Sequence, residues 1–97
     1  MEIILESQVF DNVWDALEDT PEEAANMTMR SDLLIALRQR IGMWKVTQAE
    51  AARRLQITQP RLNDLLRGRI IKFSLETLIT LAGRADIHVH LRIDKAA

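Results

Sequence analysis

Residues 47–69, TQAEAARRLQITQPRLNDLLRGR, contain two short helical patterns separated by a tight turn. The first pattern begins at Thr47, whose hydroxyl and the carboxylate of Glu50 form a capping box at a helix N-terminus. The second begins at Thr58, another N-cap residue, tolerates Pro60 in its first turn, and ends near Gly68, where glycine permits a left-handed C-terminal residue. The sequence therefore predicts helices over residues 47–55 and 58–67.

The two predicted helices carry side chains that favour close packing. Ala51 and Ala52 are small enough to let the second helix cross the first, and Ile57, Leu62 and Leu65 have the spacing to lock it there. Placing the leucines inward turns a polar set toward solvent, with Pro60, Asp64 and Arg67 outward, Arg61 and Asn63 on the flanks, and Gln59 at the leading end. We expect this helix to project a polar face.

A helix with such a face fits the major groove of DNA. Gln and Asn side chains pair bidentately with adenine, and Arg with guanine. Nearby bases would neutralise phosphates; these are Lys45, Arg53, Arg54, Arg69 and Lys72. The predicted DNA-binding residues are Gln48, Thr58, Gln59, Arg61, Asn63, Arg67 and Arg69. Asp64 has three possible roles, since its carboxylate could accept from a cytosine amine or orient either Arg61 or Arg67.

Further elements extend on both sides of this pair. Thr20-Pro21 opens a helix that continues to about Trp44, with a possible interruption near Ser31, and Ser74 caps a helix that ends near Gly83. Residues 87–93 alternate apolar and polar side chains, which is typical of a half-buried strand. This strand needs a partner, either residues 2–5 or a second copy across a two-fold axis. We favour the second copy, because it would place two recognition helices about 34 Å apart, one turn of DNA.

The N-terminal region differs in charge from the rest. Residues 1–29 carry eight acids and no Lys or Arg, whereas residues 30–72 carry ten bases and three acids. We predict a short helix over residues 7–19, with an apolar stripe of Val9, Phe10, Val13, Trp14 and Leu17. The stripe either packs on the protein's own core or docks on a basic partner. We therefore divide the chain into an acidic segment (1–20) and a second domain (21–97).

The motifs also carry a family resemblance. Residues 47–52 (TQAEAA), 57–62 (ITQPRL), 66–68 (LRG) and 73–75 (FSL) resemble the helix-turn-helix proteins of the Xre family, and most closely the HigA-like antitoxins within it. The resemblance covers about residues 22–93. It implies a mainly α, lambda-repressor-like bundle of about five helices with a C-terminal strand.

The resemblance implies partners as well. These are double-stranded operator DNA with a palindromic sequence, a second copy of the chain in a homodimer, and a RelE-like ribonuclease toxin. Gln48 would contact phosphate, and Gln59, Arg61 and Asn63 would contact DNA. Gln56 stands where the family usually has glycine, which implies a cost on the order of 1 kcal/mol for a left-handed backbone.

Composition excludes other classes of protein. The chain has no cysteine, which fits a reducing cytoplasm, and no apolar run of the roughly 20 residues that a membrane span needs. Its first residues lack the basic region of a secretory signal. His88 and His90 share a strand face without a third ligand, so we expect no metal. We also expect no cofactor, and no enzyme activity because the serines lie in cap-like contexts and the carboxylates on exposed faces. Alternative interpretations are a stand-alone Xre-family regulator and a protein-binding adaptor without DNA binding.

Overall fold

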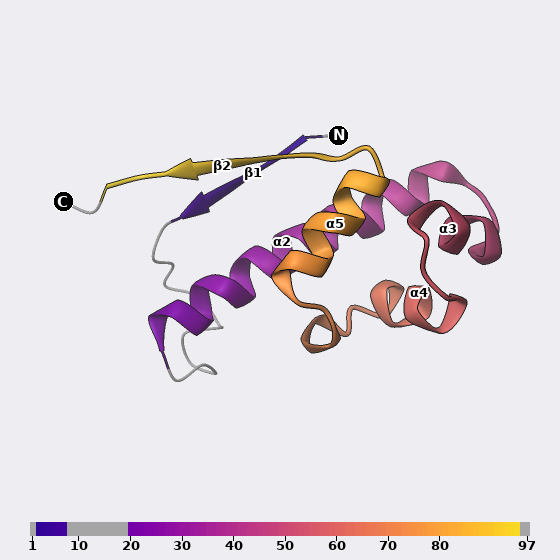
Figure 1. Cartoon of the computed structure of the whole chain (residues 1–97), viewed down its shortest axis with the longest axis horizontal. Coiled ribbons are helices and arrows are strands. Elements are labelled where there is room, and N and C mark those ends of the chain that lie inside the picture. Colours follow the sequence, from indigo (N-terminus) through magenta and orange to yellow (C-terminus); the bar gives the residue numbers. More distant parts are fainter. Residues whose placement is uncertain (1, 8–19, 96–97) are drawn as a thin grey trace.

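The computed structural model describes residues 2–7 and 20–95, with the side chains of residues 3 and 20–95 (Figure 1). The elements in order are strand β1 (Glu2–Ser7), helices α2 (Pro21–Trp44), α3 (Gln48–Leu55) and α4 (Gln59–Leu66), the 3-10 turn η1 (Ile70–Lys72), helix α5 (Leu75–Arg84) and strand β2 (His88–Ile93). The helix predicted over residues 7–19 lies outside the described residues except for Ser7, which ends β1. The mainly helical fold with a C-terminal strand is confirmed.

The longest helix, α2, begins where its local sequence predicts. The Thr20 hydroxyl accepts a hydrogen bond from the Glu23 backbone N–H at 3.1 Å, and Pro21 occupies the first helical turn. Hydrogen bonds from its own backbone and from Thr20 lower the pKa of Glu22. The helix runs without a break through Ser31, so the possible interruption is absent.

One apolar core joins the four helices. Its largest members are fully buried, and they are Leu33, Leu37, Leu55, Leu62, Leu65, Phe73, Leu78 and Leu81. Ala51 and Ala52 of α3 are also buried in this core. The described part of the chain buries no polar or charged residue completely. No described helix has the length and apolar character to cross a membrane.

The C-terminal strand finds its partner within the chain. β1 and β2 are parallel, in a register that aligns Ile3 with Val89 and Ser7 with Ile93. Ile3 and Val89 are partly buried against the core. Pairing within the chain, the alternative that we did not favour, is therefore present. A strand has two edges and β1 occupies one edge of β2, so the favoured pairing with a second copy is not excluded and stays a prediction.

The sheet and the helix pair lie at different places on the molecule. Figure 1 shows the two strands along one side of α2 and α5, while α3 and α4 lie beyond the C-terminal half of α2 and on the far side of it from the strands. The predicted DNA-binding helix is therefore remote from the sheet.

Candidate nucleic-acid interface

The α3–α4 pair is a helix-turn-helix whose helix starts are set by local hydrogen bonds. The Thr47 hydroxyl accepts from the Glu50 N–H at 3.1 Å, and the Thr58 hydroxyl accepts from the Arg61 N–H at 3.2 Å. Both threonines are therefore N-caps, as predicted. The Thr58 hydroxyl is already used in this cap, which limits what it can offer to DNA.

The turn between the helices has a left-handed residue where the sequence lacks glycine. Gln56 has φ 57° and ψ 42°. Its N–H donates to the Arg53 carbonyl at 3.1 Å, and the Ile57 N–H donates to the Ala52 carbonyl at 3.0 Å. These two bonds form a Schellman motif, which satisfies carbonyls at the end of α3. The departure at Gln56 therefore changes the cost of the turn and not its geometry.

The exposed side of α4 carries several of the predicted DNA-binding residues. Leu62 and Leu65 are completely buried, which fixes the rotation of the helix. The predicted residues that the structure leaves exposed are Gln48, Thr58, Gln59, Asn63, Arg67 and Arg69. Gln59 and Asn63 are four residues apart and so share one face of α4. This placement leaves two amides exposed on one face of a helix that Leu62 and Leu65 anchor in the core.

Arg61 is placed differently from the expectation. Its side chain turns back toward the protein, where Nη1 donates to the Lys72 carbonyl at 2.8 Å. Its guanidinium carbon lies 4.1 Å from the centroid of the Phe73 ring. Both contacts tie α4 to η1, so Arg61 is a structural link in this structure. Local sequence cannot indicate this, because the partners are 11 and 12 residues away.

Asp64 also faces the protein. Its carboxylate pairs with Arg69 at 3.2 Å and with Lys72 at 3.6 Å, and its side chain is 20% exposed. Neither Arg61 nor Arg67, the two partners considered from the sequence, is involved in these pairs. Arg69 and Lys72 thus neutralise the negative charge of Asp64, so this carboxylate does not oppose contact between α4 and a polyanion such as DNA.

The end of α4 explains how the chain reaches η1. Gly68 has φ 73°, and its N–H donates to the Leu65 carbonyl while the Arg69 N–H donates to the Asp64 carbonyl, each at 3.1 Å. This second Schellman motif turns the chain sharply after Arg67. Gly68 is therefore the left-handed residue just past the helix, as its predicted role requires.

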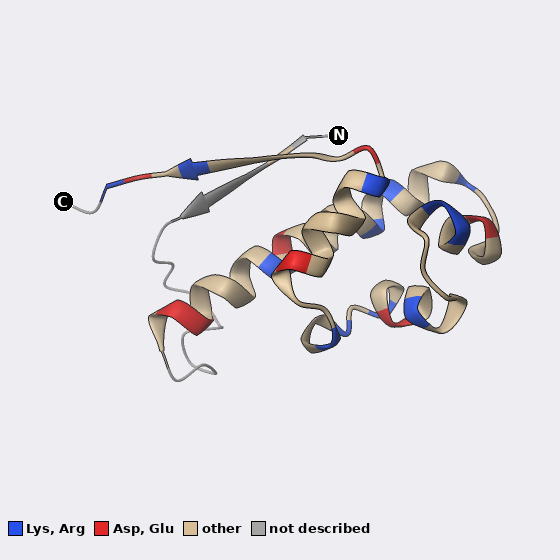
Figure 2. Ribbon diagram, in the orientation of Figure 1, with Lys and Arg blue, Asp and Glu red and all other residues tan. Residues whose placement is uncertain are grey.

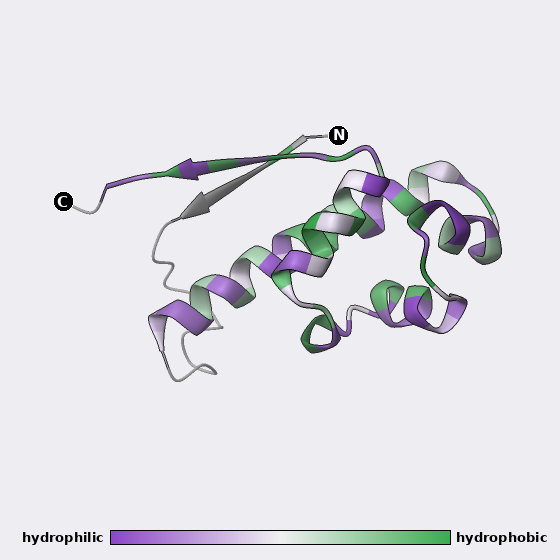
Figure 3. Ribbon diagram, viewed as in Figure 1, coloured by the Kyte–Doolittle hydropathy of each residue, from purple (hydrophilic) through white to green (hydrophobic). Residues whose placement is uncertain are grey.

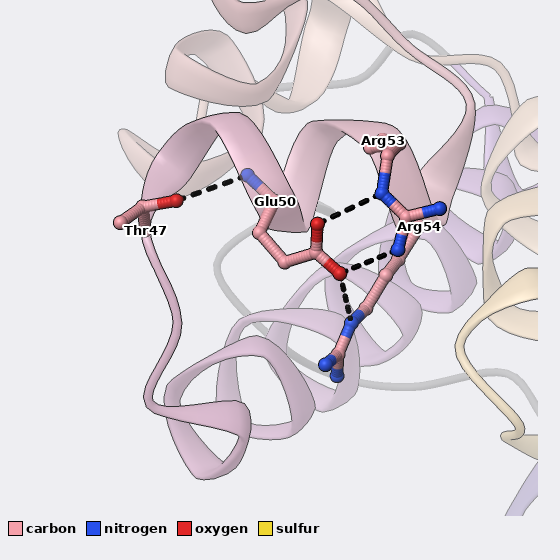
Figure 4. A network of polar contacts seen from close by, with 4 residues as sticks. All are labelled: Thr47, Glu50, Arg53 and Arg54. Carbon is pink, nitrogen blue, oxygen red and sulfur yellow. Dashed lines mark hydrogen bonds and ion pairs between the residues drawn. The ribbon is translucent and has the colours of Figure 1, made fainter.

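A compact ion network covers the outer side of α3 (Figure 4). Glu50 Oε1 lies 2.6 Å from Arg53 Nη2 and 3.2 Å from Arg54 Nε, and Arg54 lies over Trp44 with 5.0 Å to the ring centroid. Hydrogen bonds from Arg53, with a smaller contribution from Arg54, lower the pKa of Glu50 to about 2. The carboxylate is therefore ionised at neutral pH and offsets part of the positive charge that we assigned to phosphate binding.

Three further arginines, two from the basic region of residues 30–72 and one from α5, bind backbone carbonyls of distant segments. Arg30 donates to the Phe73 carbonyl at 3.2 Å, Arg40 to the Ala85 carbonyl at 2.9 Å, and Arg84 to the Leu55 carbonyl at 3.0 Å. Even so, Lys and Arg residues remain on α3, α4 and η1, as Figure 2 shows. The basic excess seen in the sequence thus serves two purposes, internal carbonyl capping and a positive surface around α4.

Comparison with known proteins agrees with this geometry. Residues 16–94 match the family described as a helix-turn-helix domain. A solved structure described as an XRE family transcriptional regulator shares 34% sequence identity and a TM-score of 0.70, over 76% of this chain and 83% of that chain. No curated protein matches the chain.

The chain therefore belongs to the helix-turn-helix proteins, a DNA-binding and non-enzymatic class. Within that class it is a member of the XRE family of transcriptional regulators.

Proposed function

We propose that this protein is the antitoxin of a type II toxin–antitoxin module, which represses its own operon and neutralises a RelE-like ribonuclease in the cytoplasm. The observation that supports operator binding is the burial of Leu62 and Leu65, which leaves Gln59 and Asn63 exposed on one face of α4. A helix with amides on its exposed face can read base edges in the major groove.

Charge separation supports the second activity. The eight acids of residues 1–29 precede the basic region that contains the helix-turn-helix. A ribonuclease holds RNA with Lys and Arg side chains, so an acidic segment complements that surface and competes for it. The apolar stripe of Val9, Phe10, Val13, Trp14 and Leu17, which lies outside the described residues, supplies the apolar anchors of the proposed contact.

A homodimer on a palindromic operator completes the proposal. The described sheet contains two strands, so β2 has a second edge that β1 does not occupy. Two copies of β2 placed antiparallel across a two-fold axis would form a four-stranded sheet. Leu91 and Ile93, which are 64% and 71% exposed, lie on the strand that this contact would cover in part.

The toxin-binding proposal is tested by substitution in the acidic segment. Deletion of residues 1–19 would also remove β1, so we prefer Phe10→Ser with Trp14→Ser, and Ile35→Ser as an exposed control on α2. Tagged protein is recovered from its native cells after nuclease treatment. We expect a small basic ribonuclease in near-stoichiometric amount, inhibited by the wild type and by Ile35→Ser, but not retained by the double variant.

Two results would count against the proposal. Equal recovery of the ribonuclease with the double variant would contradict binding through the apolar stripe, and recovery of no ribonuclease by the wild type would contradict the antitoxin role itself. In the second case, a protein that still binds its own promoter is a stand-alone regulator. The similarity to a protein described as a transcriptional regulator favours this alternative.

The dimer proposal has its own test in sedimentation equilibrium. Leu91→Asp would place like charges near each other across the two-fold axis, and we expect a monomer with weaker operator affinity. Leu91→Thr, which keeps a good strand residue without a charge, should remain dimeric. A wild-type protein that is monomeric both free and on a full palindrome would overturn the proposal.

A further inference from the structure

Ile71 stands out among the apolar residues of the described chain. It is 80% exposed, the largest exposed fraction among the large hydrophobic residues described. Its neighbours behave differently, because Ile70 packs partly against the core and Phe73 is completely buried. Figure 3 shows η1 as a strongly hydrophobic turn at the edge of the molecule. The turn thus uses one isoleucine as an anchor and presents the other to solvent.

The exposure of Ile71 is built into the fold. Backbone bonds close the turn, with the Lys72 N–H donating to the Arg69 carbonyl and the Phe73 N–H to the Ile70 carbonyl, each at 3.1 Å. Arg61 holds the following residue from the α4 side through the Lys72 carbonyl. The turn therefore cannot fold Ile71 inward without breaking these contacts.

The surroundings of Ile71 are positively charged and adjoin the recognition helix. Arg69 and Lys72, on either side of it in the sequence, are exposed, and both reach Asp64 on α4. These ion pairs fix the turn beside the C-terminal end of α4. An apolar side chain between two cations matches a DNA strand, whose phosphates alternate with apolar sugar surface and thymine methyl groups.

We propose that Ile71 is a DNA-contacting residue, which places an apolar side chain against a thymine methyl or a deoxyribose next to the site of α4. This inference rests on the proposed operator binding. In this arrangement Arg61 is a positioning residue that acts through η1, and Arg69 and Lys72 set the phosphates on either side of the contact. The DNA-binding surface then extends past the end of the recognition helix.

The experiment uses a duplex of about 30 base pairs selected by the full-length wild type from a random library, so that no operator is assumed. Fluorescence anisotropy measures its Kd for the wild type, for Ile71→Ser and for the control Ile35→Ser, which removes an exposed isoleucine from α2. We expect Ile71→Ser to weaken binding about 10-fold, which corresponds to about 1.4 kcal/mol. Ile35→Ser should bind as the wild type does.

Replacing each thymine by deoxyuridine then distinguishes the two apolar targets. If one replacement weakens the wild type but not Ile71→Ser, Ile71 contacts that methyl group; if none does so, the contact is with sugar. Sedimentation of Ile71→Ser should show the same mass as the wild type.

Three results would overturn the inference. Unchanged affinity of Ile71→Ser removes Ile71 from the interface, and a fall in its mass makes the residue a contact between copies. A wild type that selects no duplex refutes operator binding itself, a failure distinct from the other two.

Discussion

The guanidinium carbon of Arg61 lies 4.1 Å from the centroid of the buried Phe73 ring. The same side chain donates to the Lys72 carbonyl. A residue expected at the DNA surface is therefore part of the joint between α4 and η1. Its substitution is expected to affect the stability of the domain as well as its affinity for DNA.

We expect Arg61→Ala to lower the free energy of unfolding by about 1–2 kcal/mol, because it removes a stacking contact and leaves a carbonyl unpaired. Thermal unfolding should show a Tm lower by roughly 4–8 °C per kcal/mol for a domain of this size. Arg61→Lys should restore little, since an ammonium group does not reproduce the planar stack. An unchanged Tm together with a large loss of DNA affinity would contradict the structural role and support the original prediction that Arg61 contacts DNA.

The turn after α3 offers a stabilising substitution. Gln56 has a left-handed backbone, in which a side chain costs on the order of 1 kcal/mol relative to glycine. Gln56→Gly should therefore raise the free energy of unfolding by up to about 1 kcal/mol, measured by urea denaturation. Gly68→Gln is the reciprocal change at φ 73° and should destabilise the protein. Destabilisation by Gln56→Gly would show that this strain is absent.

The Glu50 network predicts a pH dependence of stability. The folded pKa of Glu50, about 2, lies below its ordinary value of 4.5, so the unfolded chain binds the proton more readily. The stabilising effect is complete above pH 4.5 and is lost as the pH falls toward 2. Denaturation of the wild type and Glu50→Gln should therefore differ at pH 6 and converge near pH 2. A difference that persists at pH 2 would contradict this assignment.

Glu50→Gln, which should lower the stability of the protein at pH 6, should strengthen its binding to DNA. Glu50→Gln removes a negative charge and releases Arg53 and Arg54 from their ion pairs. We expect tighter binding to random duplex DNA and a steeper decrease of log Kobs with log salt concentration, because more cations can meet phosphates. Salt titration of both proteins measures this slope, and identical slopes would show that the two arginines do not face DNA.

The exposed amides of α4 predict sequence discrimination. Asn63→Ala should cost about 1–3 kcal/mol on the selected duplex if its amide pairs with a base. Binding to random DNA and its salt dependence should stay unchanged, because the substitution alters no charge. An equal loss on both duplexes would make Asn63 a backbone contact.

Local sequence was sufficient wherever an element depends on neighbours along the chain. Thr20, Thr47, Thr58 and Ser74 each begin a helix, because a hydroxyl bonds an N–H three residues ahead whatever the rest of the fold does. The spacing of apolar residues likewise predicted the α3–α4 pair and the leucines that face inward from α4.

Only the tertiary structure decided the features that depend on distant residues. The partner of β2 is a strand more than 80 residues earlier. The side chain of Arg61 packs on Phe73 and does not extend into solvent, because the fold places η1 beside α4. Asp64 likewise pairs with bases that a sharp turn brings back beside α4. A sequence states which side chains can form an ion pair, a stack or a strand ladder. Which of these form depends on distances that exist only after the helices have packed.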